Sequence, residues 1–408
     1  MKKLYIIILI LMILCLHIPS SLGEKLNNNT YDNSITIDSH LENIVFKLKI
    51  NTLLKLGHYR SISACIVKNN SLVWSGAYGF SDKLFLQRPN KDTIYMAGSI
   101  SKVVTATAIM QLWENESYDF NLDDNVSKWL TFDLKNPNHP KTNITFRMLL
   151  AHQSSLLDHN VSTPELFSNQ DYSYVEKLLV PGNERYNPDY WADYQPGSKG
   201  NYSNLGFIIL GYIIENMTKL SFEEYCYENI LKPLDMKNSS FNISKINKFK
   251  LAPPYVWQGV FLRGQKFDFK FIDPCGGLYT SVEDLSHLLI AHLNGGLYKN
   301  IQILKKSTLN IMHKIQYPNS KLESGYYYGF GWAIWPDEND EPILMGHKGD
   351  LPGYHSRMYT RVSDNTTLIY IFNNDRYPRI LLPKLSSRML GYWYYQIEEL
   401  LFQKADEI

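Results

Sequence analysis

The 408-residue sequence predicts an α+β fold, in which one antiparallel sheet is assembled from both ends of the chain and a mostly helical lobe is inserted between them. Three features indicate this arrangement. A hairpin pattern occupies residues 62–79, helical patterns and polar loops dominate residues 115–254, and short apolar runs separated by turn residues follow in residues 330–372. Strands grouped at the two ends, with helices between them, favour an α+β layout over an alternating parallel one.

The first predicted elements are a hairpin and a buried helix. Ile62–Val67 and Leu72–Gly79 are rich in β-branched and aromatic residues, and they flank a turn at Asn69-Asn70. The segment Ser99–Glu114 is apolar on almost every side of a helix, which is typical of a helix surrounded by core. We therefore expect this helix to lie at the centre of the molecule.

The middle of the chain is predicted to be mostly helical. Apolar residues recur at helical spacing in Ile144–His152, Leu205–Met217 and Phe222–Leu231. These helices form the predicted lobe of residues 115–254. A further helix from Ser281 to Asn294 leads back to the sheet.

The C-terminal part of the chain is predicted to complete the sheet. Its strands are the apolar runs Phe330–Trp335, Ile343–Gly346, Tyr354–Thr360 and Leu368–Phe372. An amphipathic helix of about residues 378–401 follows them. The sheet domain is therefore expected to comprise residues 41–114 and 255–402, with flanking helices.

The N-terminal residues are expected to be an export signal and a linker. Two lysines precede an apolar run that ends in small residues, which is the layout of a secretory signal peptide over residues 1–23. Residues 24–40 are Asn-rich with few apolar side chains and are expected to be a disordered linker. Export to the periplasm, cell envelope or extracellular space follows, with an uncleaved signal anchor in the membrane as the alternative.

Charge and composition exclude several classes of partner. The 41 basic and 40 acidic side chains leave a net charge of +1, so no overall field attracts nucleic acid or an anionic membrane surface. No metal or cofactor is expected, because the sequence has no HExxH, paired CxxC or phosphate-loop glycine pattern. Beyond the signal, Cys65, Cys226 and Cys275 are expected to be buried thiols, with a single bridge as the alternative. A small-molecule or peptide substrate is expected, and the oligomeric state stays open.

Ser99 and Lys102 carry the predicted chemistry. They form an SxxK tetrad directly after Gly98, at the start of the buried helix. Free backbone N–H groups and the helix dipole would stabilise a serine alkoxide there. Lys102 returns to the same face one turn later, and burial should lower its pKa, so it could accept the serine proton. The alternative is an N-cap serine beside a surface lysine.

Two further polar groups stand at the ends of elements. Tyr202 and Asn204 are two residues apart and should point the same way in an extended segment, where Tyr202 could move protons and Asn204 could bind a substrate amide oxygen. At the end of a predicted strand, His347 and Gly349 should face one side and Lys348 the other. Gly349 has no side chain to block a ligand backbone.

In this order, the groups at Ser99, Tyr202 and His347 resemble those of the serine β-lactamase-like superfamily, in the branch of class C β-lactamases, D-alanyl-D-alanine carboxypeptidases and related esterases. The likeness runs from about Ile62 to Asn373 and implies a β-lactamase/transpeptidase-like fold. Four further segments carry it: Ile144–Leu156, similar to ITIRxLLxHTSGL; Pro274–Leu278, similar to PAGGL; Tyr328–Trp332; and Gly346–Gly353.

The resemblance implies a role for each site residue. Ser99 is the nucleophile, and Lys102 and Tyr202 share the role of base. The oxyanion hole is formed by the backbone N–H groups of Ser99 and Asp350. The residues assigned to substrate binding are Asn204, His347, Gly349 and Asp350.

The sequence departs from the family pattern at the third motif. His347 replaces the lysine of KTG, as in some carboxypeptidase and esterase members, and Lys348 replaces a hydroxyl residue that helps to hold a substrate carboxylate. Penicillin or peptide specificity is therefore in question. Because histidine titrates near pH 6.5, we expect His347 to give turnover a pH dependence in that region.

Together these features predict a serine hydrolase that forms an acyl-enzyme with an ester or amide. Esterase, carboxypeptidase-like and β-lactamase-like activities stay open. The alternative is a catalytically silent scaffold or binding protein with the same fold. An α/β-hydrolase is disfavoured because the sequence has no GxSxG nucleophile elbow.

Overall fold

The computed structural model describes residues 34–82, 86–158, 172–258, 261–264, 273–375 and 383–408. The predicted signal peptide, residues 1–23, lies outside these ranges, as does the predicted linker up to residue 33.

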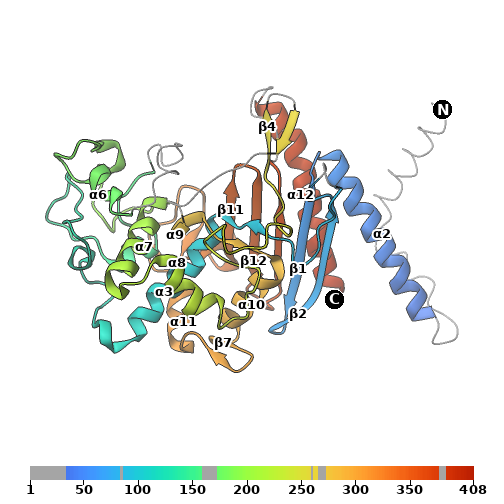
Figure 1. Ribbon diagram of the computed structural model, residues 1–408, viewed down its shortest axis with the longest axis horizontal. Helices are drawn as coiled ribbons and strands as arrows, with labels where there is room; N and C mark the ends of the chain where they lie inside the picture. The colour runs from blue at the N-terminus through green and yellow to red at the C-terminus, as the bar shows by residue number, and fades with distance from the viewer. Residues whose placement is uncertain (1–33, 83–85, 159–171, 259–260, 265–272, 376–382) are drawn as a thin grey trace.

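A seven-stranded antiparallel sheet forms the centre of the molecule, in the order β2-β1-β13-β12-β11-β10-β9 (Figure 1). Because β1 pairs with both β2 and β13, early and late parts of the sequence meet inside the sheet. This confirms the predicted α+β fold. The strands are β1 (Ser61–Lys68), β2 (Ser71–Gly79), β9 (Tyr327–Tyr328), β10 (Ala333–Pro336), β11 (Pro342–Leu351), β12 (Tyr354–Arg361) and β13 (Thr367–Phe372).

The turn between β1 and β2 follows from its two asparagines. Asn69 and Asn70 have φ angles of 50° and 56°. Two consecutive positive φ angles are the conformation of a type I′ turn, which matches the twist of the flanking strands, and asparagine tolerates it better than most residues. The predicted hairpin is therefore confirmed.

Helices cover both faces of the sheet. On one face, α2 (Ser34–Leu56) and α12 (Pro383–Glu407) contact each other and the sheet, and on the opposite face α10 (Val282–Leu293) contacts β1 and β13 (Figure 1). Side chains along β1 alternate accordingly. Ile62 and Ile66 pack in the cluster under α2 and α12, whereas Cys65 and Val67 belong to the larger core on the other side.

The start of α2 corrects one sequence expectation. Residues 34–40, expected to be disordered linker, belong to this helix. Nearer its C-terminal end, α2 buries Phe46, Ile50, Leu53 and Leu54 against the sheet. Once those turns are fixed by packing, each further helical residue adds a hydrogen bond without a new nucleation cost, so the helix extends beyond its buried part.

The segment between the two parts of the sheet is largely helical and loop-rich. Among the described residues, no single helix is long and apolar enough to cross a bilayer, although the bent pair formed by residues 204–218 and 222–231 passes the length and composition test together. The predicted domain boundaries stay a prediction.

The remaining helices are α4 (Phe146–Leu150), α6 (Tyr174–Leu179), α7 (Asn204–Thr218), α8 (Phe222–Cys226) with a π-turn at Tyr227–Leu231, α9 (Asp273–Gly276) and α11 (Lys306–Met312). Short two-stranded ladders pair β3 (Tyr95–Met96) with β6 (Tyr279–Thr280), β4 (Tyr255–Gln258) with β5 (Phe261–Gly264), and β7 (Leu297–Tyr298) with β8 (Ile301–Gln302).

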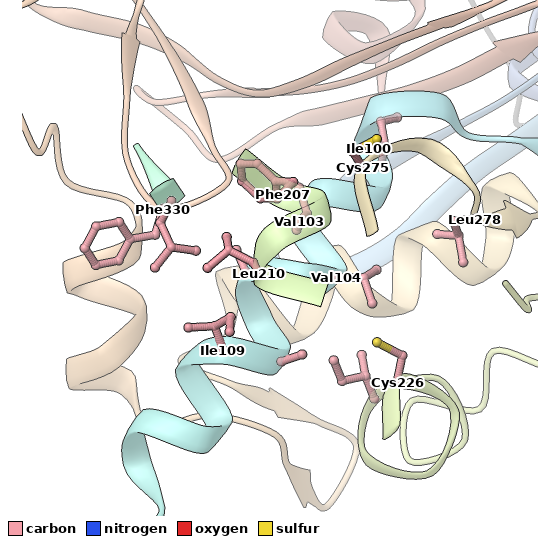
Figure 2. Packing of buried hydrophobic residues seen from close by; sticks show 14 of the residues in the cluster. Ile100, Val103, Val104, Ile109, Phe207, Leu210, Cys226, Cys275, Leu278 and Phe330 are labelled. Carbon is pink, nitrogen blue, oxygen red and sulfur yellow. The ribbon is translucent and has the colours of Figure 1, made fainter. Parts of the chain in front are cut away.

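The central helix α3 (Ser101–Glu114) is buried along most of its length, as predicted. Its contacts include α7, α8 and α9. Figure 2 shows Val103, Val104 and Ile109 of α3 among side chains of these helices. Within this described core Cys226 and Cys275 are free thiols, as is Cys65, which confirms buried thiols over a bridge.

Candidate active site

The turn that carries Ser99 lies directly on strand β11. Ser99 stands in a short 3-10 turn, η2 (Gly98–Ile100), immediately before α3. Gly98 has a φ angle of +55°, and a Cβ placed on it would come within 3.1 Å of the Asp350 amide nitrogen. A Cβ on Gly349 would come within 1.9 Å of the Ala97 carbonyl oxygen. The two glycines therefore permit a backbone approach that places the Ser99 turn beside the Asp350 amide.

The Lys102 side chain is fully buried beside Ser99. Its Nζ donates to Ser99 Oγ at 3.1 Å, to Asn204 Oδ1 at 2.6 Å and to the Cys275 carbonyl oxygen at 2.7 Å. Burial lowers the pKa of this ammonium to about 8. A surface lysine, the alternative considered from sequence, is thereby ruled out.

The three acceptors around Lys102 differ in one respect. Ser99 Oγ can donate a proton, whereas the Cys275 carbonyl and Asn204 Oδ1 can only accept. After Lys102 loses a proton, its two remaining N–H groups can continue to bind these fixed oxygens. The nitrogen lone pair then faces Ser99 Oγ, so the arrangement is suited to take the serine proton.

Asn204 is itself held by Asp158, a residue that sequence reasoning missed. The Asn204 side-chain Nδ2 donates to Asp158 Oδ2 at 2.7 Å. The backbone N–H groups of Asn204 and Leu205 also donate to this carboxylate, at the first turn of α7. Asp158 lies two residues beyond Leu156, where the family-like segment ends. This position near a family motif was the one sequence signal that could have pointed to Asp158.

Tyr202 completes the group around Ser99 and Lys102. Its ring centroid lies 4.8 Å from Lys102 Nζ. Burial raises the pKa of the Tyr202 hydroxyl well above 10, and a hydrogen bond with Ser99 opposes this only in part. The phenol is therefore neutral at physiological pH. Ser203, with Oγ accepting from the Gly206 N–H, is the N-cap of α7, so Asn204 is free of that role.

The family profile described as Beta-lactamase matches residues 46–382 of this chain. The chain belongs to the beta-lactamase family. Protein flp of Staphylococcus aureus (strain MW2) is similar, with 28% identity over 359 residues that cover 87% of this chain and 68% of the relative. Beta-lactamase-like protein 2 of Dictyostelium discoideum is 28% identical over 306 residues, covering 73% and 53%.

Solved structures show the same fold. The octameric penicillin-binding protein homologue from Pyrococcus abyssi superposes with a TM-score of 0.68 at 26% identity, covering 87% of this chain and 78% of the other. The D-amino acid amidase from Ochrobactrum anthropi SV3, at 20% identity, gives a TM-score of 0.65 and covers 87% and 98%. The serine β-lactamase/transpeptidase superfamily and its fold are thereby confirmed, and most members of that superfamily are serine hydrolases.

The structure corrects the expectation that His347 titrates near pH 6.5. Burial, reinforced by the Lys102 charge, lowers the pKa of His347 to about 3. The imidazole therefore stays neutral near pH 6.5, and the expected titration of His347 in that region is wrong. Burial was not visible in the sequence, where His347 stood at the end of a strand.

Side chains along strand β11 alternate between its two faces, as predicted. His347 and Gly349 are buried on the side of the Ser99 turn, whereas Lys348 and Asp350 are exposed on the other side. The Lys348 ammonium lies 5.1 Å from the Trp335 ring centroid. The Asp350 carboxylate accepts from Arg357 Nη1 at 3.0 Å, so Asp350 presents only its backbone to the turn at Gly98.

His152 is a second site residue that sequence reasoning did not single out. Its ring packs against Tyr202 with centroids 4.3 Å apart. The N–H of Asn201 donates to the His152 carbonyl at 2.9 Å, and the N–H of Ser203 donates to its Nδ1 at 3.0 Å. The backbone is therefore held on both sides of Tyr202. His152 stands in the segment that resembles ITIRxLLxHTSGL, which was the signal available for it.

The structure thus gathers the predicted side chains at one place. Lys102 contacts Ser99, Asn204 and the Tyr202 ring. Strand β11 borders this group through His347, Gly349 and the Asp350 backbone. In the described part of the chain, no group of three or more His, Cys, Asp or Glu side chains could hold a metal ion.

Proposed function

We propose that this protein is a serine hydrolase that cleaves an ester or amide through an acyl-enzyme on Ser99. The observation that carries the proposal is the position of Lys102 Nζ, which is fixed by Asn204 Oδ1 and the Cys275 carbonyl and directed at Ser99 Oγ at 3.1 Å. A lysine buried at this cost, with a pKa near 8, is the kind of base that activates a serine hydroxyl.

Acylation would proceed through three proton transfers. Neutral Lys102 takes the Ser99 proton as Oγ attacks the substrate carbonyl, and the developing oxyanion accepts from the N–H groups of Ser99 and Asp350. The leaving group then receives a proton from Tyr202, which its raised pKa keeps protonated. Lys102 then passes the proton it took from Ser99 to the Tyr202 phenolate. Both groups return to their starting state, and the acyl group stays on Ser99.

Two features of the third motif, His347–Gly349, support a substrate that places no carboxylate beside this strand. The hydroxyl residue of KTG is replaced by Lys348, which lies on the strand face away from the Ser99 turn. His347 is neutral, so it offers no charge to an anionic substrate group. Uncharged esters and amides are therefore the class of substrates that we propose this protein turns over.

Active-site labelling tests the proposal. A fluorescent phosphonate should label the wild-type protein, and the labelled peptide should contain Ser99. Ser99→Ala should abolish labelling, while Ser117→Ala, at an exposed serine outside the site, should leave it unchanged. No labelling of the folded wild-type protein would favour the alternative of a catalytically silent scaffold.

Export is the second part of the proposal. Its support is the signal-like pattern of residues 1–23. N-terminal sequencing of the protein recovered from a secreting host should begin close to Gly23. A protein that keeps Met1 and stays with the membrane fraction would indicate an uncleaved anchor instead.

A further inference from the structure

The Asp158 carboxylate is an acceptor at the N-terminus of α7. It receives the backbone N–H groups of Asn204 and Leu205, the hydroxyl of Ser203 at 3.2 Å, and the side-chain Nδ2 of Asn204 at 2.7 Å. Backbone N–H and amide NH2 groups can only donate. Burial raises the pKa of Asp158, but these donors and the Lys102 charge oppose that rise. Asp158 therefore binds them as an ionised carboxylate, which the N-terminus of a helix also favours.

These contacts determine which way the Asn204 amide faces. The two ends of a side-chain amide have nearly the same shape but opposite hydrogen-bonding character. Because Nδ2 must face the Asp158 carboxylate, Oδ1 must face the other way, and there it accepts from Lys102 Nζ at 2.6 Å. Asp158 thus acts on Lys102 through a single intervening side chain.

We propose that Asp158 is a positioning residue of the hydrolytic site, which locks the Asn204 amide so that Asn204 holds Lys102 with its lone pair towards Ser99. The inference rests on the proposed function and extends it to a residue that touches no reacting atom.

An asparagine at position 158 would reverse this arrangement. With the amide oxygen facing the backbone donors, its NH2 group would meet Asn204 Nδ2, and two donors cannot satisfy each other. The Asn204 amide would then flip and present its own NH2 group to Lys102. The Lys102 ammonium would lose an acceptor, and the neutral amine would accept from Asn204, so its lone pair would no longer face Ser99.

Asp158→Asn should also change the pKa of Lys102, because it removes a negative charge. Asp158 raises the pKa of Lys102, opposing the effect of burial. Removing the charge and the Asn204 acceptor should therefore lower this pKa further, by about one unit. The rate of acylation should fall even though more of the lysine is neutral. A residue that only stabilised the fold would not produce this combination.

The experiment measures both quantities on the full chain. Lysine labelled with ¹³C gives the pKa of Lys102 by NMR, with its signal identified by loss in Lys102→Met, and reaction with an uncharged activated ester gives the acylation rate. In Asp158→Asn we expect the Lys102 pKa to fall by about one unit and acylation to slow about 10- to 100-fold. Ser203→Ala is the matched control, because it removes another Asp158 contact and the N-cap of α7 without touching the Asn204 amide. It should lower the melting temperature but leave the Lys102 pKa in place.

Two further variants keep the proposal open to refutation. In an Asn204→Ala background, Asp158→Asn should slow acylation little further, because the effect on the rate passes through Asn204. Should Asp158→Asn not fold, Asp158→Glu keeps the charge but displaces it, and it should slow acylation with the Lys102 pKa nearly unchanged. An unchanged Lys102 pKa and rate in folded Asp158→Asn would overturn the proposal. The NMR readout does not depend on turnover, so failure of the proposed function would appear separately, as absent wild-type labelling.

Discussion

The Tyr328 hydroxyl lies 2.6 Å from Nε2 of His347, in a contact between two buried side chains. On the other side of the ring, His347 Nδ1 lies 2.6 Å from the Lys348 carbonyl oxygen. A carbonyl can only accept, so Nδ1 carries the proton and Nε2 accepts from Tyr328. A second proton on Nε2 would make that nitrogen the donor to Tyr328, but burial lowers the pKa of His347 to about 3, so the ring stays in this one neutral tautomer.

The neutral state of His347 can be observed directly. In ¹⁵N NMR spectra, with the signal assigned by its loss in His347→Gln, we expect the tautomer protonated at Nδ1 from pH 5 to 9. Burial keeps its pKa near 3, well below this range. A titration step near pH 6.5 would contradict the assignment.

Removing the Tyr328 hydroxyl should cost stability. In Tyr328→Phe, the buried Nε2 of His347 loses its donor, which typically costs about 1–3 kcal/mol. Tyr395→Phe makes the same chemical change at a ring that is 65% exposed, and it should have little effect. The free energies of unfolding in urea measure both, and equal values for the two variants would show that the contact does not stabilise the fold.

Much of the fold could be predicted because hydrophobic patterns and turn residues are local signals. The turn at Asn69-Asn70 and the buried helix α3 appear where the pattern placed them. Helix α2 was missed because its stability comes from packing Phe46 and Ile50 on a sheet that only the tertiary structure creates.

In the candidate site, too, contacts between residues close in sequence could be predicted, whereas contacts between distant residues could not. The SxxK spacing was sufficient to bring Lys102 to Ser99, since both stand on adjacent turns. Asp158 could not be found in this way, because its contact with Asn204 joins residues 46 positions apart. The low pKa of His347 could not be predicted from the sequence either, because it results from burial and not from the residue type.

A β-lactam should acylate this protein but turn over slowly. Tyr202 stays neutral because burial raises its pKa, and neutral His347 offers no positive charge to stabilise a phenolate. Water attack on a bulky acyl group that stays in the site would then depend on Lys102 alone. With nitrocefin we expect about one equivalent of fast product followed by a slow phase, whereas sustained rapid hydrolysis would refute this account of deacylation.

Acid should destabilise the fold through a pair of histidines, of which His292 is buried and His313 is half-buried. His292 Nδ1 lies 3.3 Å from His313 Nε2 beneath α3, and burial lowers the pKa of both rings, that of His313 to about 4. A folded-state pKa below the unfolded value of about 6.5 means that the stabilisation is present above pH 6.5 and is lost as the pH falls towards 4.

Urea denaturation at a series of pH values measures this loss. His313 alone should account for a decrease on the order of 2–3 kcal/mol between pH 6.5 and 4. His313→Asn should show a shallower decrease over the same range. An identical pH dependence in the two proteins would assign the acid sensitivity elsewhere.

The central claim, that Lys102 is the base held against Ser99, is tested most directly by the pH dependence of acylation. The pseudo-first-order rate of reaction with an uncharged activated ester should rise with pH and level off above about 8, because Lys102 must lose its proton before it can accept that of Ser99. Lys102→Met should remain folded yet acylate more than about 10²-fold more slowly, without this transition. A wild-type profile that is flat between pH 6 and 9, or a Lys102→Met variant that retains the transition near pH 8, would contradict the assignment.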